Sequence, residues 1–161
     1  MGQNLRDWAN IDAGLLHFKR LARQLPEDGV AIAFPNETSC RVRLAEVRWP
    51  GGPVCPVCSA HKIGHITRGD LYRCNECSKA FSAISGTILH KTSVGLRTCF
   101  LIAERILTDP PGYHLRVTLN SIVSEFSISK TSALKFRSLI TNDIWSNPPG
   151  LITRSVCTGV L

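Results

Sequence analysis

Apolar residues recur every three or four positions near the start of the chain. Trp8, Leu15 and Phe18 belong to this stripe, and its period of about 3.6 residues predicts an amphipathic helix over residues 4–25. Pro26 follows and ends the helix. A long apolar stripe is rarely left in water. We therefore expect this helix to pack either on the rest of the chain or on a second copy, which would make a homodimer.

Two further helices are predicted towards the middle of the chain. One begins at Asn36, a residue type that caps helix N-termini well, and places Cys40 and Leu44 on one face. The other spans residues 92–108, where apolar positions again keep the helical period. Before Asn36, the short apolar run at residues 30–34 predicts an extended segment.

Residues 118–142 predict two helices with a break near Ser127. Ser129 can cap the second helix. The buried face of that helix is predicted to hold Ala133, Phe136 and Ile140, and its exposed face Lys130, Thr131, Ser132, Lys135 and Arg137. A short helix, a turn and a polar, basic second helix are typical of a helix-turn-helix, although any two-helix hairpin gives a similar pattern and glycine is more usual where Ser127 stands.

The segment between these helical parts is rich in cysteine. Cys55 and Cys58 form one C-x-x-C pair and Cys74 and Cys77 form another, with 15 residues between them. Four thiolates from two such turns suit a tetrahedral zinc ion, so the spacing predicts one structural Zn²⁺ per chain. Two nearby histidines are rival ligands, but the four cysteines already fill the shell, and we expect the histidines on the surface: His61 and His65.

Composition and charge narrow the functional classes. The chain has 161 residues, of which 43% are hydrophobic and 19% charged, and a net charge of +7. A basic balance favours a polyanionic partner, most often nucleic acid, although it can also serve solubility. No stretch approaches the roughly 18 apolar residues of a membrane span, and no secretory signal pattern opens the chain. We expect a cytoplasmic, nucleoid-associated protein with no membrane partner.

These patterns predict a mainly α fold with a small β zinc ribbon and a helix-turn-helix after the ribbon. The predicted organisation has four parts: an N-terminal amphipathic helix and linker (1–35), a short helix plus four-cysteine zinc ribbon (36–91), a helical helix-turn-helix domain (92–145) and a C-terminal tail (146–161).

Several short motifs together resemble the N-terminal part of a family of bacterial insertion-sequence transposases. They are FPNE through Cys40, RWPGGPVCPVC, LYRCNEC, FSAISGTIL and LRTCF, followed by SIVSEFSISKTSALKF. The resemblance covers residues 34–142. It implies zinc at the four paired cysteines and DNA binding by the ribbon and the helical pair.

The same resemblance suggests that the catalytic half is missing. Those transposases continue into a large RNase-H-like domain with metal-binding carboxylates, whereas few residues follow 142 here. Glu104, Asp109 and Glu125 are scattered singly, and we expect them to be solvated charges. Asp143 is the sole acid after them. Since two-metal phosphoryl transfer needs several converging carboxylates, the chain alone is predicted not to be an enzyme.

The function that these observations favour is zinc-dependent, sequence-specific binding of double-stranded DNA, as in a transcriptional regulator related to a transposase DNA-binding region. Two alternatives stay open: an accessory transposase subunit with a catalytic partner, and a zinc ribbon that binds RNA polymerase. For DNA binding, the first turn of the second helix would read bases and ribbon cations would contact phosphates. The predicted DNA contacts are Lys62, Arg68, Arg73, Lys79, Lys130, Thr131, Ser132, Lys135 and Arg137.

Overall fold

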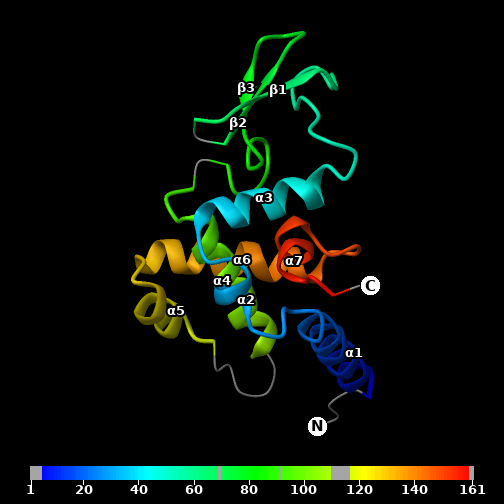
Figure 1. Ribbon diagram of the computed structural model, residues 1–161. Helices are drawn as coiled ribbons and strands as arrows, with labels where there is room; N and C mark the ends of the chain where they lie inside the picture. Colours follow the sequence, from blue (N-terminus) through cyan, green and yellow to red (C-terminus); the bar gives the residue numbers. More distant parts are fainter. Residues whose placement is uncertain (1–4, 69, 91, 110–116, 160–161) are drawn as a thin grey trace. The chain divides into compact units, whose positions relative to one another are not determined.

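The computed structural model describes residues 5–68, 70–90, 92–109 and 117–159, with side chains described from residue 14 onward. The described chain is mainly helical with one small antiparallel sheet, which confirms that part of the predicted fold class (Figure 1). It divides into two compact units. We call Phe34–Arg97 the ribbon unit, and Met1–Ala33 together with Thr98–Leu161 the helical unit.

The elements follow one another along the chain as α1 (Leu5–Ala22), α2 (Val30–Ala33), α3 (Glu37–Arg48), β1 (Ile63–Ile66), β2 (Leu71–Cys74), β3 (Ala80–Phe81), α4 (Leu96–Thr108), α5 (Leu119–Phe126), α6 (Lys130–Trp145) and α7 (Leu151–Val156).

Helix α3 opens the ribbon unit at the predicted residue. Asn36 is its N-cap: the Asn36 side chain accepts a hydrogen bond from the Ser39 backbone N–H (2.8 Å), and the Asn36 N–H is donated to Ser39 Oγ (3.3 Å). This reciprocal capping box satisfies two backbone donors that the first helical turn leaves free. Cys40 and Leu44 are fully buried, as the helical period predicts.

The three strands form an antiparallel sheet in the order β1-β2-β3. Tyr72 of β2 lies opposite His65 of β1 and Phe81 of β3. Two cysteines and Phe81 make a small buried cluster, against which half-buried aromatics pack. Trp49 meets the rings of Tyr72 and Phe81 edge-on, with centroids 5.6 and 5.8 Å away. The sheet is therefore too small to bury more than a few side chains.

Helix α4 begins directly after Gly95, a glycine that allows close approach of a carboxylate. Glu37 accepts hydrogen bonds from the backbone N–H groups of Leu96 and Arg97, both at 3.0 Å. A Cβ on Gly95 would collide with this carboxylate. Because the first N–H groups of a helix lack partners, an acid from α3 here satisfies two of them and favours the helix dipole.

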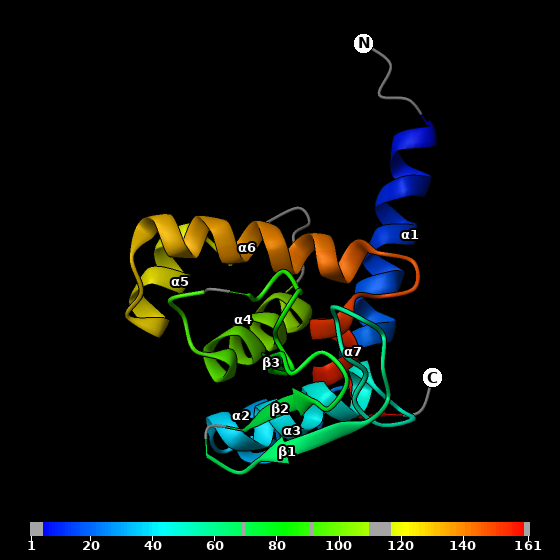
Figure 2. The ribbon, with the colours of Figure 1, turned by 90° about the horizontal axis from the view of Figure 1, so that it is seen from above.

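The core of the helical unit contains the buried faces of α4 and α6. Phe100, Ile102 and Ile106 of α4 and Phe136 and Ile140 of α6 are at most 2% exposed. Helix α6 contacts α5 near one end and α7 near the other (Figure 2). The predicted pair in residues 118–142 thus appears as α5 and α6, joined by the three residues 127–129.

The predicted extended segment at 30–34 is wrong. Residues Val30–Ala33 form the helical turn α2, and Val30 is fully buried. The Val30 N–H is donated to Glu104 Oε1 at 2.8 Å. Glu104 is therefore a capping partner rather than the solvated charge that we expected. The turn is stabilised by an acid 74 residues away, which local sequence could not reveal.

The tail predicted for residues 146–161 also needs correction, because it contains α7 and packs into the core. Ile152 and Val156 are fully buried. Asp143, only 7% exposed, accepts hydrogen bonds from Thr153 N–H and Thr153 Oγ1 at 2.7 Å, and from Ile152 N–H at 3.4 Å. Gly150 leaves room for this carboxylate, since a Cβ there would collide with it.

The predicted helix over residues 4–25 is α1, which ends before Pro26. Phe18 is buried at 1% exposure, whereas Leu15 remains 37% exposed. Beside Phe18, the His17 ring stacks on Trp145 of α6 (centroids 5.6 Å apart). Phe18 thus packs within the chain. The side chain of Trp8 lies outside the described residues, and the dimer stays a prediction.

Candidate metal centre and nucleic-acid interface

The two C-x-x-C pairs form a matched pair of backbone turns. The Cys55 N–H is donated to the carbonyl of Ala60 (3.0 Å), and the Cys74 N–H to the carbonyl of Lys79 (2.9 Å). Each turn thus closes a bond from its first cysteine to the residue five positions later. Hairpin β1–β2 then brings the second turn back beside the first.

A serine follows the second cysteine of each pair and gives both turns their conformation. Ser59 has φ 59° and Ser78 has φ 58°, both in the left-handed region. L-residues enter that region reluctantly, so the repeated geometry indicates two copies of one turn. The shared letters C-x-x-C-S are the signal in the sequence for this repeated turn.

The four predicted ligands come together at one point. All four cysteine Sγ atoms lie within 4.8 Å of one another. The Cys55–Cys77 and Cys58–Cys74 Sγ distances are 3.6 and 3.5 Å. A tetrahedral zinc ion with Zn–S bonds of about 2.3 Å requires sulfurs about 3.8 Å apart. The donor set therefore fits one structural zinc ion, and a closed shell of four thiolates leaves no position for a catalytic water.

Local hydrogen bonding prepares Cys55 to be a thiolate. Burial raises the pKa of the Cys55 thiol, but hydrogen bonds from the backbone N–H groups of Cys58 and Val57 and from the Cys77 and Cys58 thiols together lower this pKa to about 6. Cys40 shows the contrast. Burial and the nearby Glu37 charge raise the pKa of its thiol to about 11, so Cys40 is a neutral core thiol at pH 7.

The two rival histidines lie outside this shell. His61 and His65 are both exposed, and the His65 ring packs against Tyr72 with centroids 5.4 Å apart. Within the described residues, the four cysteines are the one group of three or more potential ligands close enough to share a metal ion. This agrees with the expectation that cysteines alone fill the shell.

The four predicted ribbon cations all lie on the surface. Lys62 is 3.5 Å from Glu76, in an ion pair whose two side chains are 79% and 55% exposed. Arg68 is in the turn after β1, and Lys79 precedes β3. Arg73 stands in β2 between Gly64 of β1 and Ala80 of β3. Both neighbours across the strands are small, and Arg73 is exposed.

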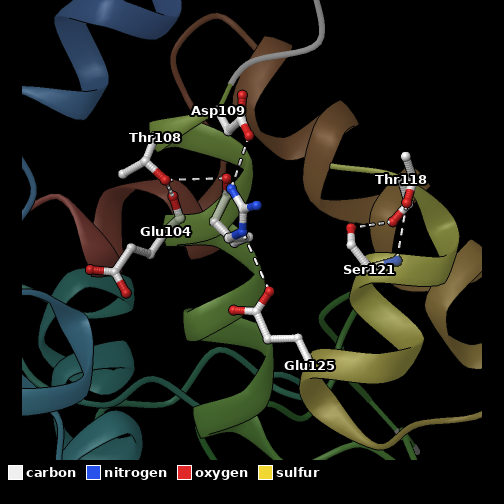
Figure 3. A network of polar contacts seen from close by, with 7 residues as sticks. Glu104, Thr108, Asp109, Thr118, Ser121 and Glu125 are labelled. Carbon is white, nitrogen blue, oxygen red and sulfur yellow. Dashed lines mark hydrogen bonds and ion pairs between the residues drawn. The ribbon is translucent and has the colours of Figure 1, made fainter. Parts of the chain in front are cut away.

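Helix α5 is fixed at both ends by polar contacts. At its start the Thr118 side chain accepts a hydrogen bond from Ser121 N–H at 3.1 Å. Near its end, Glu125 Oε2 is 3.4 Å from Arg105 Nε of α4 (Figure 3). Arg105 also pairs with Asp109 at 3.1 Å. Glu125 is exposed, as expected of a solvated charge, but both acids also pair with Arg105, and Asp109 is only 22% exposed.

The turn between α5 and α6 has the geometry that a glycine would adopt without strain. Ser127 lies in the left-handed region, with φ 51° and ψ 38°. Ser129 then caps α6 as predicted, accepting a hydrogen bond from Ser132 N–H at 3.1 Å. Ala133, Phe136 and Ile140 are buried. The direction and starting residue of α6, and thus which of its side chains are buried, therefore depend on the backbone conformation of Ser127 and on the Ser129 cap.

The exposed face of α6 differs in part from the predicted one. Lys130, Thr131 and Lys135 are exposed. Ser132 and Arg137 are half-buried, and the Ser132 hydroxyl accepts a hydrogen bond from Ser129 Oγ. Sequence analysis missed Leu134, whose side chain is 53% exposed. Its position one residue outside the apolar stripe was the available signal.

Comparison with known proteins supports the zinc assignment. Residues 35–80, which include all four cysteines, match the transposase zinc-ribbon domain family. The chain is also 32% identical over 71 residues to an uncharacterized protein in transposable element ISH50 of Halobacterium salinarum; the match covers 42% of this chain and 24% of that protein. The chain therefore spans about a quarter of the length of this curated relative.

No solved structure matches the chain, and no helix in the described part is both long and apolar enough to cross a bilayer. The family match, the relative and the four clustered sulfurs agree on one conclusion: the chain contains a zinc ribbon similar to those of transposases.

Proposed function

We propose that the chain is a zinc-stabilised protein that binds double-stranded DNA in a sequence-specific way and acts as a transcriptional regulator related to a transposase DNA-binding region. The observation that carries the proposal is the transposase-type zinc ribbon itself, matched over residues 35–80 around a complete four-cysteine shell. The net charge of +7 supports a polyanionic partner.

Two surfaces have different roles in this proposal. In the ribbon unit, Arg68, Arg73 and Lys79 contact phosphates, which adds affinity without sequence choice. Lys62 joins them, because an exposed ion pair such as that with Glu76 is weak enough to open. In the helical unit, α5 and α6 act as a helix-turn-helix whose second helix enters the major groove.

The capped start of α6 suits it to that role. Its first turn carries no acid, and a helix N-terminus favours a negative partner. Lys130 and Thr131 stand exposed there. We assign base contacts to Thr131 and phosphate contacts to Lys130 and Lys135. Ser132 and Arg137 contribute less, because both are half-buried.

A salt series on two duplexes tests the proposal. Duplexes selected by the zinc-loaded full chain from a random library are compared with scrambled versions. Thr131→Ala should reduce the preference for the selected duplex and leave the salt slope unchanged. Arg68→Ala or Lys79→Ala should weaken binding to both duplexes and reduce the slope by about one each.

Arg20→Ala is the matched control, since Arg20 is an exposed cation of α1 that the proposal leaves out of the contact. It should change neither quantity. Equal losses on both duplexes for Thr131→Ala and Arg68→Ala would remove α6 from sequence reading. Absence of any preference for a selected duplex would refute sequence-specific binding, and would favour the protein-binding alternative if polymerase capture survives nuclease treatment.

We further propose that the chain alone does not cleave DNA or transfer strands. Glu104 is engaged at α2 and Asp143 at α7, while Asp109 and Glu125 share one cation, Arg105. Among the described side chains, no three carboxylates lie close enough together to share a metal ion, whereas two-metal catalysis needs several converging carboxylates. Magnesium-dependent cleavage that disappears in Asp143→Asn or Glu104→Gln, while both variants stay folded, would overturn this proposal and favour the transposase-subunit alternative.

A further inference from the structure

One large apolar side chain stands among the polar residues of α6. Leu134 is 53% exposed, whereas its neighbour Ala133 and the later Phe136 and Ile140 are at most 2% exposed. Lys130 and Thr131 precede Leu134 by four and three residues, so the helical repeat places them on the same surface. Leu134 therefore lies on the face opposite the core, next to the capped first turn.

The surroundings of Leu134 favour a polyanion over an apolar protein surface. The exposed positions nearest to it along α6 carry Lys130, Thr131, Lys135 and Ser138. The single acid of α6, Asp143, is buried and occupied at α7. A lone apolar side chain among cations and hydroxyls is far smaller than the patches that mark protein interfaces.

The other exposed large apolar residue that α6 contributes, within the described chain, is Trp145. It follows Leu134 by eleven residues, which is about 16 Å along a helix axis. The two side chains therefore cannot share one small apolar patch. The occupant that best matches this surface combines negative charge with one isolated apolar group.

Duplex DNA offers that combination in its major groove. The thymine 5-methyl group is the apolar feature that a base pair presents there, beside hydrogen-bonding base edges and flanked by phosphates. We propose that Leu134 is a specificity-determining residue that packs on a thymine methyl group, while Thr131 contacts a neighbouring base edge. The proposal rests on the DNA-binding function and on α6 as the reading helix.

Replacing thymine by deoxyuridine removes the methyl group and leaves every hydrogen-bonding group in place. The experiment measures binding of the zinc-loaded full chain to its selected duplex and to a set in which each thymine is replaced singly. For the unsubstituted protein, one or two positions should lose about fourfold in affinity, as expected for one methyl group that returns to water. Leu134→Ala should bind the thymine and deoxyuridine forms of those duplexes equally.

Two further variants keep the test decisive. Leu134→Met retains an apolar contact and should retain most of the discrimination. Leu16→Ala is the matched control, because Leu16 of α1 is also exposed (65%) and lies outside α6; it should retain all of it. Zinc content and helicity are measured for each variant, and Leu134→Gln, which keeps a good helix former but removes the apolar contact, replaces Leu134→Ala as the readout if the alanine variant does not fold.

The possible results separate this inference from the proposed function. A protein that prefers no duplex over a scrambled one overturns both. Specific binding with no loss at any deoxyuridine position overturns the inference alone. So does a Leu134→Ala variant that still discriminates as the unsubstituted protein does. A change in solution mass on Leu134→Ala, with DNA discrimination intact, would identify Leu134 as a contact between copies and also overturn the inference.

Discussion

The two units of the molecule are stabilised by different means. Of the twelve largest fully buried side chains in the described chain, ten belong to the helical unit and two, Leu44 and Leu89, to the ribbon unit. Around the sheet, the buried cluster consists of Phe81 and two of the metal ligands. Each of the strands β1, β2 and β3 is at most four residues long. A fold this small usually needs a metal or disulfides.

The comparison shows where each part of the chain derives its free energy of folding. In the helical unit, burial of Phe100, Phe136 and Ile140 removes large apolar areas from water. In the ribbon unit, zinc supplies what apolar burial does not, because metal binding and folding are coupled. The two units should therefore respond to different perturbations.

The largest expected effect is loss of zinc. Cys74→Ser removes a buried ligand, and structural zinc can contribute on the order of 10 kcal/mol to folding. We expect the variant to lose its zinc ion and the strands to unfold, while the helical unit keeps a cooperative thermal transition. Metal analysis and circular dichroism during heating measure the two effects.

Cys40→Ser is the control for this change. Cys40 is buried in the same unit but lies outside the metal shell, so one zinc per chain should remain. A zinc-free Cys74→Ser chain with an unchanged sheet would show that apolar burial suffices for the ribbon. If Cys74→Ser unfolded both units together, they would form one cooperative folding unit.

The sequence predicted the metal centre better than any other feature, and the reason is local. A C-x-x-C turn is defined by a few adjacent residues, so its four ligands could be assigned by spacing alone. The caps at Asn36 and Ser129 were predicted for the same reason. Helical periods predicted most buried positions, including Phe136 and Ile140.

The errors have the opposite cause, because they depend on contacts with residues outside the local pattern, one of them distant in sequence. Val30 begins a helical turn since Glu104, 74 residues later, accepts its N–H. Helix α7 is held by Asp143 and a nearby glycine, but the apolar residues of 146–161 do not follow a pattern that predicts a helix. Carboxylates that cap helices across the fold have the same local appearance as solvated ones.

The second prediction removes one of these carboxylates from the helical unit. Asp143→Ala leaves the Thr153 N–H and hydroxyl without their 2.7 Å partner inside the core. A buried donor without an acceptor costs about 1–3 kcal/mol, so the unit should lose about 3 kcal/mol of unfolding free energy. Asp143→Asn keeps one acceptor and should lose about half as much. Denaturant unfolding measures both.

Asp143→Ala also tests whether the two units are independent, since its zinc content should stay at one per chain. Glu27→Ala, at an exposed acid in the loop after α1, is the control and should change the unfolding free energy by less than about 0.5 kcal/mol. If Asp143→Ala were as stable as the unsubstituted chain, α7 would contribute nothing to the helical unit. If it released zinc, the ribbon unit would depend on α7.

The smallest expected effect concerns serines with a left-handed backbone conformation, which occur in both units. Ser127 ends α5 with φ 51°, as Ser59 and Ser78 end the two metal-binding turns. The left-handed conformation costs an L-residue about 1–2 kcal/mol, and glycine removes that cost but loses about 0.5–1 kcal/mol to greater freedom in the unfolded chain. Ser127→Gly should therefore stabilise the helical unit by about 0.5 kcal/mol and leave zinc affinity unchanged. Ser124→Gly, three residues earlier and inside α5, is the control and should destabilise the unit by a similar amount. Denaturant midpoints of the two variants must then move in opposite directions; a shift of both towards lower stability would mean that the fold of residues 127–129 does not strain Ser127.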